Sequence, residues 1–188
     1  METNAQLEIS RELAVGERLL WSGRPYQGLV LLQPFDAFVI PFGLLWTGGV
    51  IAGMVGMSRS QTPADPFGLV FLSLFVAVGL YMVFGRFLVD ARQRQRTFYG
   101  LTDQRVIIIR GVFRREIRSI NLKAMSDLSL SERRDKTGAI RFGSWDLFAH
   151  MSGMEFWSPG IAGSNSFTRI PNVRDVYDQI RAAQSKAA

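Results

Sequence analysis

The chain contains no cysteine among its 188 residues. This absence excludes a disulfide framework, a thiolate metal site and a cysteine nucleophile. The single histidine, His150, leaves no basis for a histidine-rich metal site. His150 follows Asp146 by four residues, a spacing that could serve acid–base chemistry, but no convincing nucleophile stands beside the pair. We therefore expect a loop histidine and no catalytic residue, metal or cofactor.

Charge is missing from two long apolar stretches. Residues 37–58 and 66–85 contain no Asp, Glu, Lys or Arg. Each has about 20 residues, which at about 1.5 Å per residue matches a hydrocarbon core of about 30 Å. Buried helices of a soluble bundle normally keep a polar stripe, and neither stretch has one. We predict a transmembrane hairpin over residues 37–89, preceded by a polar lead-in, residues 1–36, that does not resemble a cleaved signal peptide.

The two predicted spans carry features of closely packed helices. Asp65 and Pro66 form a typical helix start, because Asp caps exposed N–H groups and Pro fits the first helical position. Small residues recur at four-residue spacing: Gly49 and Gly53, Ala52 and Gly56, Ser73 and Ala77. This spacing lets helix backbones approach closely. The short loop favours contact within one chain, and contact between two copies remains open.

Basic residues follow the second apolar stretch at once. The nearest are Arg86, Arg92, Arg94 and Arg96. Positive charge accumulates on the cytoplasmic side within about 15–20 residues of a span. We predict that these arginines anchor the flank at the inner leaflet of the cell membrane, with both termini in the cytoplasm. Aromatic interleaving is limited to Phe98 and Tyr99, so we expect no nucleic acid partner.

Residues 96–188 have the pattern of a mainly β domain. Short strand-like runs occupy residues 97–102, 105–110, 113–122, 127–131, 138–142, 154–157 and 166–170. The period then changes, with Val173, Val176, Tyr177 and Ile180 on one face of a helix and Asn172 as its cap. Seven short strands closed by one C-terminal helix predict a partly open barrel or sandwich.

The order of these segments resembles the bacterial pleckstrin-homology (PH) family. The similar segments are "YGLTDQRVIIIRG" at 99–111, a strand that ends near Leu122, "GAIRF" at 138–142, and the lead-in "GERLLWSGRP" at 16–25. The resemblance implies a membrane-anchored cytoplasmic domain that supports interaction or assembly, without catalytic residues. Phosphoinositide-binding relatives carry a K-x-n-R-x-R pattern around the first hairpin. Here that hairpin reads "TDQR", with one basic residue, so we do not expect phosphoinositide binding.

A second basic group lies inside the β domain of this chain, whose net charge is +6. Its members are Arg114, Arg115, Arg118, Lys123, Arg133, Arg134 and Lys136. They could form a face for anionic lipid headgroups or for an acidic partner, or a solvated exterior with Glu116, Glu132 and Asp135 as local partners. The sequence thus predicts a binding or scaffold module with an unidentified protein partner. Recognition of headgroups at the inner leaflet is the alternative.

Overall fold

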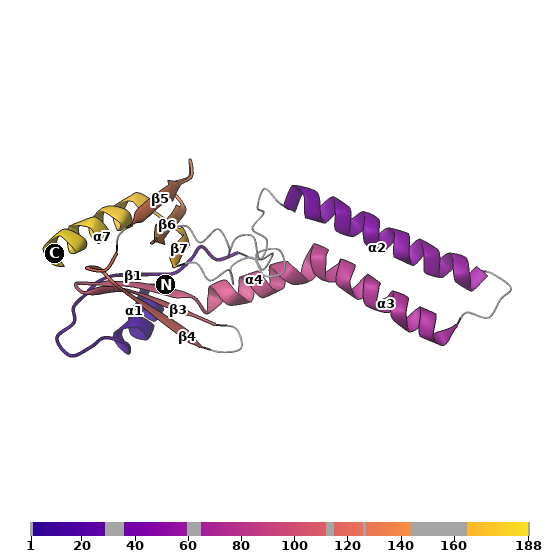
Figure 1. Cartoon of the computed structure of the whole chain (residues 1–188), viewed down its shortest axis with the longest axis horizontal. Helices are drawn as coiled ribbons and strands as arrows, with labels where there is room; N and C mark the ends of the chain where they lie inside the picture. Colours follow the sequence, from indigo (N-terminus) through magenta and orange to yellow (C-terminus); the bar gives the residue numbers. More distant parts are fainter. Residues whose placement is uncertain are drawn as a thin grey trace.

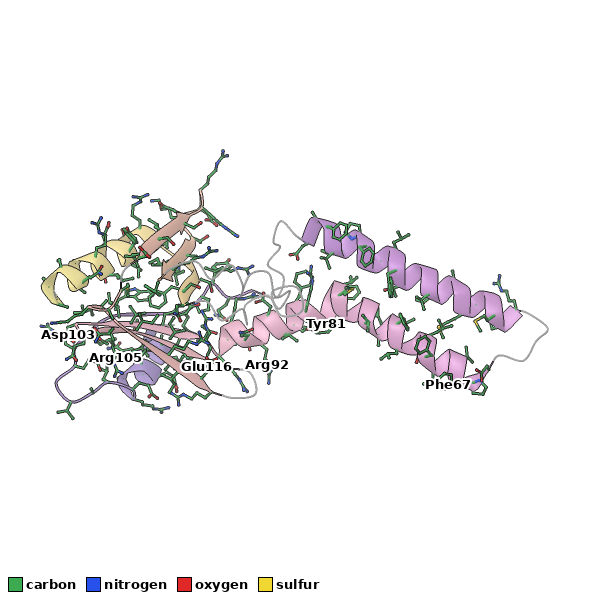
Figure 2. All side chains as sticks on the ribbon, in the orientation of Figure 1. Phe67, Tyr81, Arg92, Asp103, Arg105 and Glu116 are labelled. Atoms are coloured by element: carbon green, nitrogen blue, oxygen red, sulfur yellow. The ribbon has the colours of Figure 1, made fainter. Side chains whose placement is uncertain are left out.

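The computed structural model describes residues 2–28, 36–59, 65–111, 115–125, 127–143 and 165–187. Figure 1 shows a β domain that holds both chain ends and two long helices that project away from it. In Figure 2, Phe67 lies at the far tip of these helices, and Asp103 lies at the opposite end of the molecule. The two parts predicted from the sequence, an apolar helical pair and a mainly β domain, are therefore both present.

The first sheet contains a strand from each side of the long helices. Its antiparallel strands follow the order β1-β2-β3-β4. They are β1 (Leu19–Gly23), β2 (Phe98–Thr102), β3 (Arg105–Arg110) and β4 (Glu116–Asn121). Strand β1 precedes the helices in the chain, yet it pairs with β2, which follows them, with Gly23 opposite Tyr99. The lead-in thus supplies an edge strand, a pairing that the sequence analysis did not predict.

Both faces of the first sheet are covered, which explains the unbroken apolar run on β3. Val106 and Ile108 face the main core, whereas Ile107 and Ile109 pack against Ile9 of α1 (Glu2–Ser10). A strand buried on both faces reads as a continuous apolar run rather than an alternating one. Gly100 on β2 leaves room for this helix, because a Cβ there would lie 2.6 Å from Ile9.

The second sheet has three antiparallel strands in the order β5-β6-β7. They are β5 (Leu128–Glu132), β6 (Gly138–Phe142) and β7 (Ser166–Ile170). Phe167 joins the two sheets, because its ring centroid lies 4.6 Å from that of Tyr99 and 5.6 Å from that of Trp21. Within the described ranges the sheets do not close into a barrel. Six of the seven predicted strands coincide with β2 to β7, and the other, residues 154–157, lies outside the described residues.

Helix α7 (Val173–Ala187) covers the core as its periodicity predicted. Val173, Val176 and Ile180 are buried, and Tyr177 packs against them partly exposed. The predicted side-chain cap takes another form. Asn172 has a φ of 47°, and its backbone carbonyl accepts the N–H of Asp175 at 3.1 Å. The described contacts thus show a backbone turn at the start of this helix.

The long helices extend beyond the apolar stretches. Helix α2 spans Asp36–Arg59, and α3 (Pro66–Leu80) continues through the π-helical turn η1 (Tyr81–Gly85) into α4 (Arg86–Gln95). Asp65 caps α3 as predicted, with its carboxylate accepting the N–H groups of Phe67 and Gly68. By length and composition both long helices could cross a membrane, and only 17% and 11% of their most apolar windows are buried.

Two close contacts between the long helices lie nearer the β domain than the predicted small-residue pairs do. A Cβ on Gly43 would lie 2.8 Å from Val83, and one on Gly79 would collide with the hydroxyl of Thr47. By contrast, a Cβ on Gly49 or Gly53 would meet nothing within 4 Å. The two helices therefore pack against each other within the chain, as preferred, but through Gly43 and Gly79 rather than through Gly49 and Gly53.

Candidate functional site

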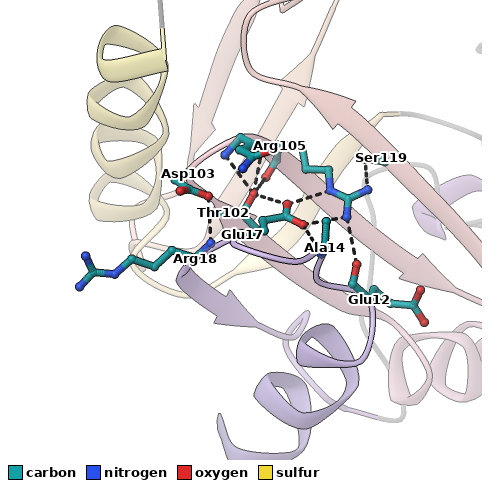
Figure 3. A network of polar contacts seen from close by, with 9 residues as sticks. Glu12, Ala14, Glu17, Arg18, Thr102, Asp103, Arg105 and Ser119 are labelled. Atoms are coloured by element: carbon teal, nitrogen blue, oxygen red, sulfur yellow. Dashed lines mark hydrogen bonds and ion pairs between the residues drawn. The ribbon is translucent and has the colours of Figure 1, made fainter.

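The lead-in is fastened to the first sheet by a buried carboxylate (Figure 3). Glu17 receives two hydrogen bonds from the Arg105 guanidinium, Nε to Oε1 and Nη2 to Oε2, both at 2.8 Å. The Thr102 hydroxyl lies 2.7 Å from Oε1, and the Ala14 amide donates to Oε2 at 2.7 Å. These residues come from the lead-in and from the β2–β3 turn. Two of the segments that carry the family resemblance, residues 16–25 and 99–111, therefore meet in space.

The electrostatics of this network identify a structural role. The side chain of Glu17 is 1% exposed. Hydrogen bonds from Arg105 lower the pKa of Glu17 from 4.5 to about 2, although burial acts in the opposite direction. Its carboxylate oxygens are occupied by Arg105, Thr102 and Ala14. A carboxylate held in this way fixes the lead-in against the sheet.

Two members of the second basic group are neutralised locally. Arg115 pairs with Glu8 at 3.2 Å and Glu12 at 2.9 Å, both near α1. Arg118 pairs with Glu116 at 2.6 Å. The two arginines therefore face opposite sides of the first sheet, as strand alternation predicts. Arg114 lies outside the described residues.

The other members of this group keep their charges exposed. Arg133, Arg134 and Lys136 lie in the turn between β5 and β6, which we call the basic turn, and Lys123 follows β4. The acids expected as local partners are occupied, because Glu132 pairs with Arg174 at 2.8 Å and Asp135 accepts bonds from Thr137. No ion pair joins the basic turn to an acid in the described part of the chain. These side chains thus differ from Arg115 and Arg118, whose charges are paired.

The arginines predicted as flank anchors divide into two kinds. Arg86 and Arg94 are buried on α4 and pair with Asp36 and Asp90. Arg92 and Arg96 are exposed, and Figure 2 shows Arg92 extending away from α4. The acidic partners Asp36 and Asp90 were not among the residues predicted from the sequence. Their signal was present, because Asp36 stands directly before the first apolar stretch and Asp90 precedes Arg94 by one helical turn.

The described residues contain no group of three or more acidic or histidine side chains arranged to hold a metal ion. His150 and Asp146 lie outside them. The polar networks described above, such as Glu17 with Arg105 and Arg86 with Asp36, instead connect distant segments of the chain.

Two antiparallel sheets with a C-terminal helix define a PH-like domain whose first connection contains the apolar helices. The family model for the Bacterial PH domain matches residues 40–184. This range covers more than half of the chain, so the chain belongs to that family, as the segment order suggested. No curated protein and no solved structure matches the chain.

The position of β1 shows that the prediction of "TDQR" as the first hairpin was wrong. The segment "TDQR" joins β2 to β3 and is therefore the second connection of the sheet. The first connection runs from Arg24 to Thr97 and carries Arg94 and Arg96 just before β2. Arg24 donates to the Gln95 carbonyl and stacks on Phe98 at 4.8 Å, and Arg94 pairs with Asp90. Arg24 and Arg94 are therefore held by contacts within the chain.

Proposed function

We propose that this chain is a membrane-anchored member of the bacterial PH family whose β domain binds a protein partner in the cytoplasm, without a catalytic step. The pairing of β1 with β2 carries the proposal. Strands of one sheet lie in one compartment, so a membrane-inserted pair of helices between them must leave on the side where it entered. This requirement agrees with a two-span hairpin whose ends both lie on the side of the β domain.

The surface of the helices supports insertion. Their exposed residues include Leu45, Phe67 and Val70, which are 70–78% exposed. Burying such side chains in a bilayer removes them from water. Arg92 and Arg96 are exposed at the end of the second helix that adjoins the β domain. Positively charged residues next to a membrane span prefer the cytoplasmic side.

Reporter fusions test this arrangement. A reporter placed after Ala188 should show cytoplasmic activity, and the same reporter inserted at Gln61 should show activity on the other side. Resistance of the full chain to alkaline carbonate extraction should accompany this result. Activity of both fusions in the cytoplasm, together with carbonate release, would show that the helices do not span a membrane. Activity of the Ala188 fusion outside the cytoplasm would reverse the orientation.

Recognition of anionic headgroups is a second candidate, because the basic turn is exposed and forms no ion pair within the described ranges. Each basic residue near an anionic membrane contributes about 1 kcal/mol of attraction. Since the chain has no cysteine, one fluorophore can be attached at Ser131→Cys beside the turn. In nanodiscs, quenching by headgroup-labelled lipid should increase with anionic lipid content if the turn contacts the bilayer. Equal quenching in neutral and anionic nanodiscs would mean that the basic turn does not recognise anionic headgroups, and a protein partner would then be its expected ligand.

A further inference from the structure

A network of alternating charges lies where the long helices meet the β domain. Arg86 of α4 pairs with Asp36, the first residue of α2, and Arg94 pairs with Asp90 one turn earlier. Arg169 of β7 brings the second sheet into the network, with Nη1 at 3.8 Å from Asp90 Oδ2. Burial and the positive charge of Arg133 lower the pKa of the Arg169 guanidinium, whereas the nearby Asp36 acts in the opposite direction. The network therefore links α2, α4 and β7.

The backbone of β7 is distorted at the residue that makes this link. Strand β6 advances from Gly138 to Ile140 while β7 advances from Phe167 to Ile170, so β7 contains one extra residue. Within this bulge Arg169 has a φ of 53°, in the left-handed region that non-glycine residues rarely adopt. A bulge redirects side chains, and such strain persists only where the surroundings impose it. Here the distorted residue carries the side chain that faces Asp90.

The remaining attachments of α4 come from the first-sheet side of the domain. The Thr97 hydroxyl donates to the Gln93 carbonyl at 2.8 Å, and Gln27 donates to the Arg94 carbonyl at 3.1 Å. Only Arg96 and Thr97 separate α4 from β2. A short connection of this kind can act as a hinge, because a few residues between elements can absorb a change of angle. Contact with Arg169 would fix that angle.

The charge network between α2, α4 and β7, which we call the joint, is better suited to a contact that opens than to a permanent one. Removing charges from water is costly, and apolar packing of similar volume often gives greater stability than a buried ion-pair network. The Nε atoms of Arg86 and Arg94 are buried without a hydrogen-bond partner in the described part of the chain. Together with the backbone strain at Arg169, these features lower the stability of the closed joint. The contact remains specific, because Arg86 faces Asp36 and both Arg94 and Arg169 face Asp90, while the repulsion between Arg94 and Arg169 lowers its stability further.

We propose that Arg169 is a latch that holds the long helices at one angle to the β domain and lets them swing about the Arg96 and Thr97 connection when its contact with Asp90 opens. The latch is a conformational device added to the membrane-anchored module. It couples a change at the second sheet to the orientation of the helices. Its operation does not depend on which side of a membrane the domain occupies.

Spin-label distance measurements on the full chain in detergent test the latch. The absence of native cysteine allows one pair at Ala77→Cys on α3 and Asp178→Cys on α7, and a second pair at Lys123→Cys and Arg181→Cys inside the domain. The informative variant is Arg169→Gly, because glycine adopts a positive φ freely and removes only the side chain. We expect the distance distribution between helix and domain to broaden at least about twofold, with the domain pair unchanged.

Arg174→Gln is the matched control, because Arg174 pairs with Glu132 and makes no described contact with α4. This control should keep the narrow distribution of the unmodified chain. An Arg169→Gly distribution as narrow as that of the unmodified chain would overturn the latch, and so would an equally broad distribution before substitution. If Arg169→Gly also broadens the domain pair, Asp90→Asn decides with Arg94→Gln beside it, because both remove the Arg94–Asp90 pair and only Asp90→Asn also removes the contact with Arg169. A broad distribution for Asp90→Asn alone supports the latch, and equal distributions for the two variants reject it.

Discussion

Glu17 and Arg105 form a two-point ion pair between positions 88 residues apart in the chain. One lies just before the first strand of the sheet, and the other begins the strand that follows the second connection. The pair, with the Ala14 and Thr102 contacts, secures a lead-in that would otherwise be separated from the sheet by both long helices. It gives a physical reason for the "GER" and "LTDQR" segments to occur in one sequence.

Replacing Glu17 by Gln should destabilise the domain by about 2–3 kcal/mol at neutral pH, because Arg105 loses its charged partner. The pKa of Glu17 is about 2 in the folded chain, below its ordinary value of 4.5. The stabilisation is therefore fully present above about pH 4.5 and is lost as the pH falls toward 2. Thermal unfolding from pH 7 to pH 2 should show the variant and the unmodified chain converging in acid.

Arg18→Gln is the control for this prediction. Its side chain is exposed, and its contacts with Asp103 are made by the backbone. This variant should change the unfolding temperature little at any pH. A parallel pH profile for Glu17→Gln and the unmodified chain would contradict the role given to the carboxylate.

Helix α7 provides a test of core packing. Ile180 is fully buried, and Arg181 beside it is exposed. Ile180→Asp should place an unpaired charge in the core and lower the free energy of unfolding by about 4 kcal/mol. Arg181→Ala should change it by less than about 0.5 kcal/mol. Chemical denaturation of the full chain in detergent measures both, and equal midpoints would mean that α7 does not dock on the sheets.

The two long helices offer a pair of glycines in opposite surroundings. Gly79→Ala should destabilise the contact between the helices by about 1–3 kcal/mol, because the new methyl group would collide with the buried Thr47. Gly53→Ala should be tolerated, since nothing lies within 4 Å of its Cβ position. Thermal unfolding in detergent compares them. Greater damage from Gly53→Ala would show that this face of α2 packs against something, such as a second copy.

The basic turn gives the prediction closest to function. Replacing Arg133, Arg134 and Lys136 together by Gln should weaken binding to an acidic surface at low salt without unfolding the domain, because exposed charges contribute little to stability. The difference should shrink at high salt, where the Debye length falls from about 8 Å to about 3 Å. Binding of the purified full chain to anionic nanodiscs, or to a partner once isolated, provides the measurement.

Arg118→Gln is the comparison for the basic turn, because Arg118 already pairs with Glu116. It should weaken binding less than the triple substitution does. If the triple variant binds as strongly as the unmodified chain at low salt, the basic turn is only a solvated exterior.

Local patterns were sufficient to predict much of the β domain. The run at 106–109 and the period of α7 depend on residues close in sequence, so strands and helix could be recognised. Strand β1 was missed because its five residues are recognisable only through their pairing with β2, far along the chain. Arg86 and Arg94 were assigned to a membrane flank because proximity to a span predicts that role, whereas burial beside Asp36 and Asp90 depends on how distant segments pack.

The pairing of β1 with β2 also sets an order of events during synthesis. Strand β1 leaves the ribosome before either long helix, and β2 leaves after both. The first sheet therefore cannot be completed until the helices have been made. In a membrane-inserted chain, an error that leaves only one helix across the bilayer would strand β1 and β2 on opposite sides, with Glu17 and Arg105 permanently apart. The β domain can therefore be completed only in a correctly inserted chain. A chain without this domain exposes unfolded apolar sequence to the proteases that remove failed membrane proteins.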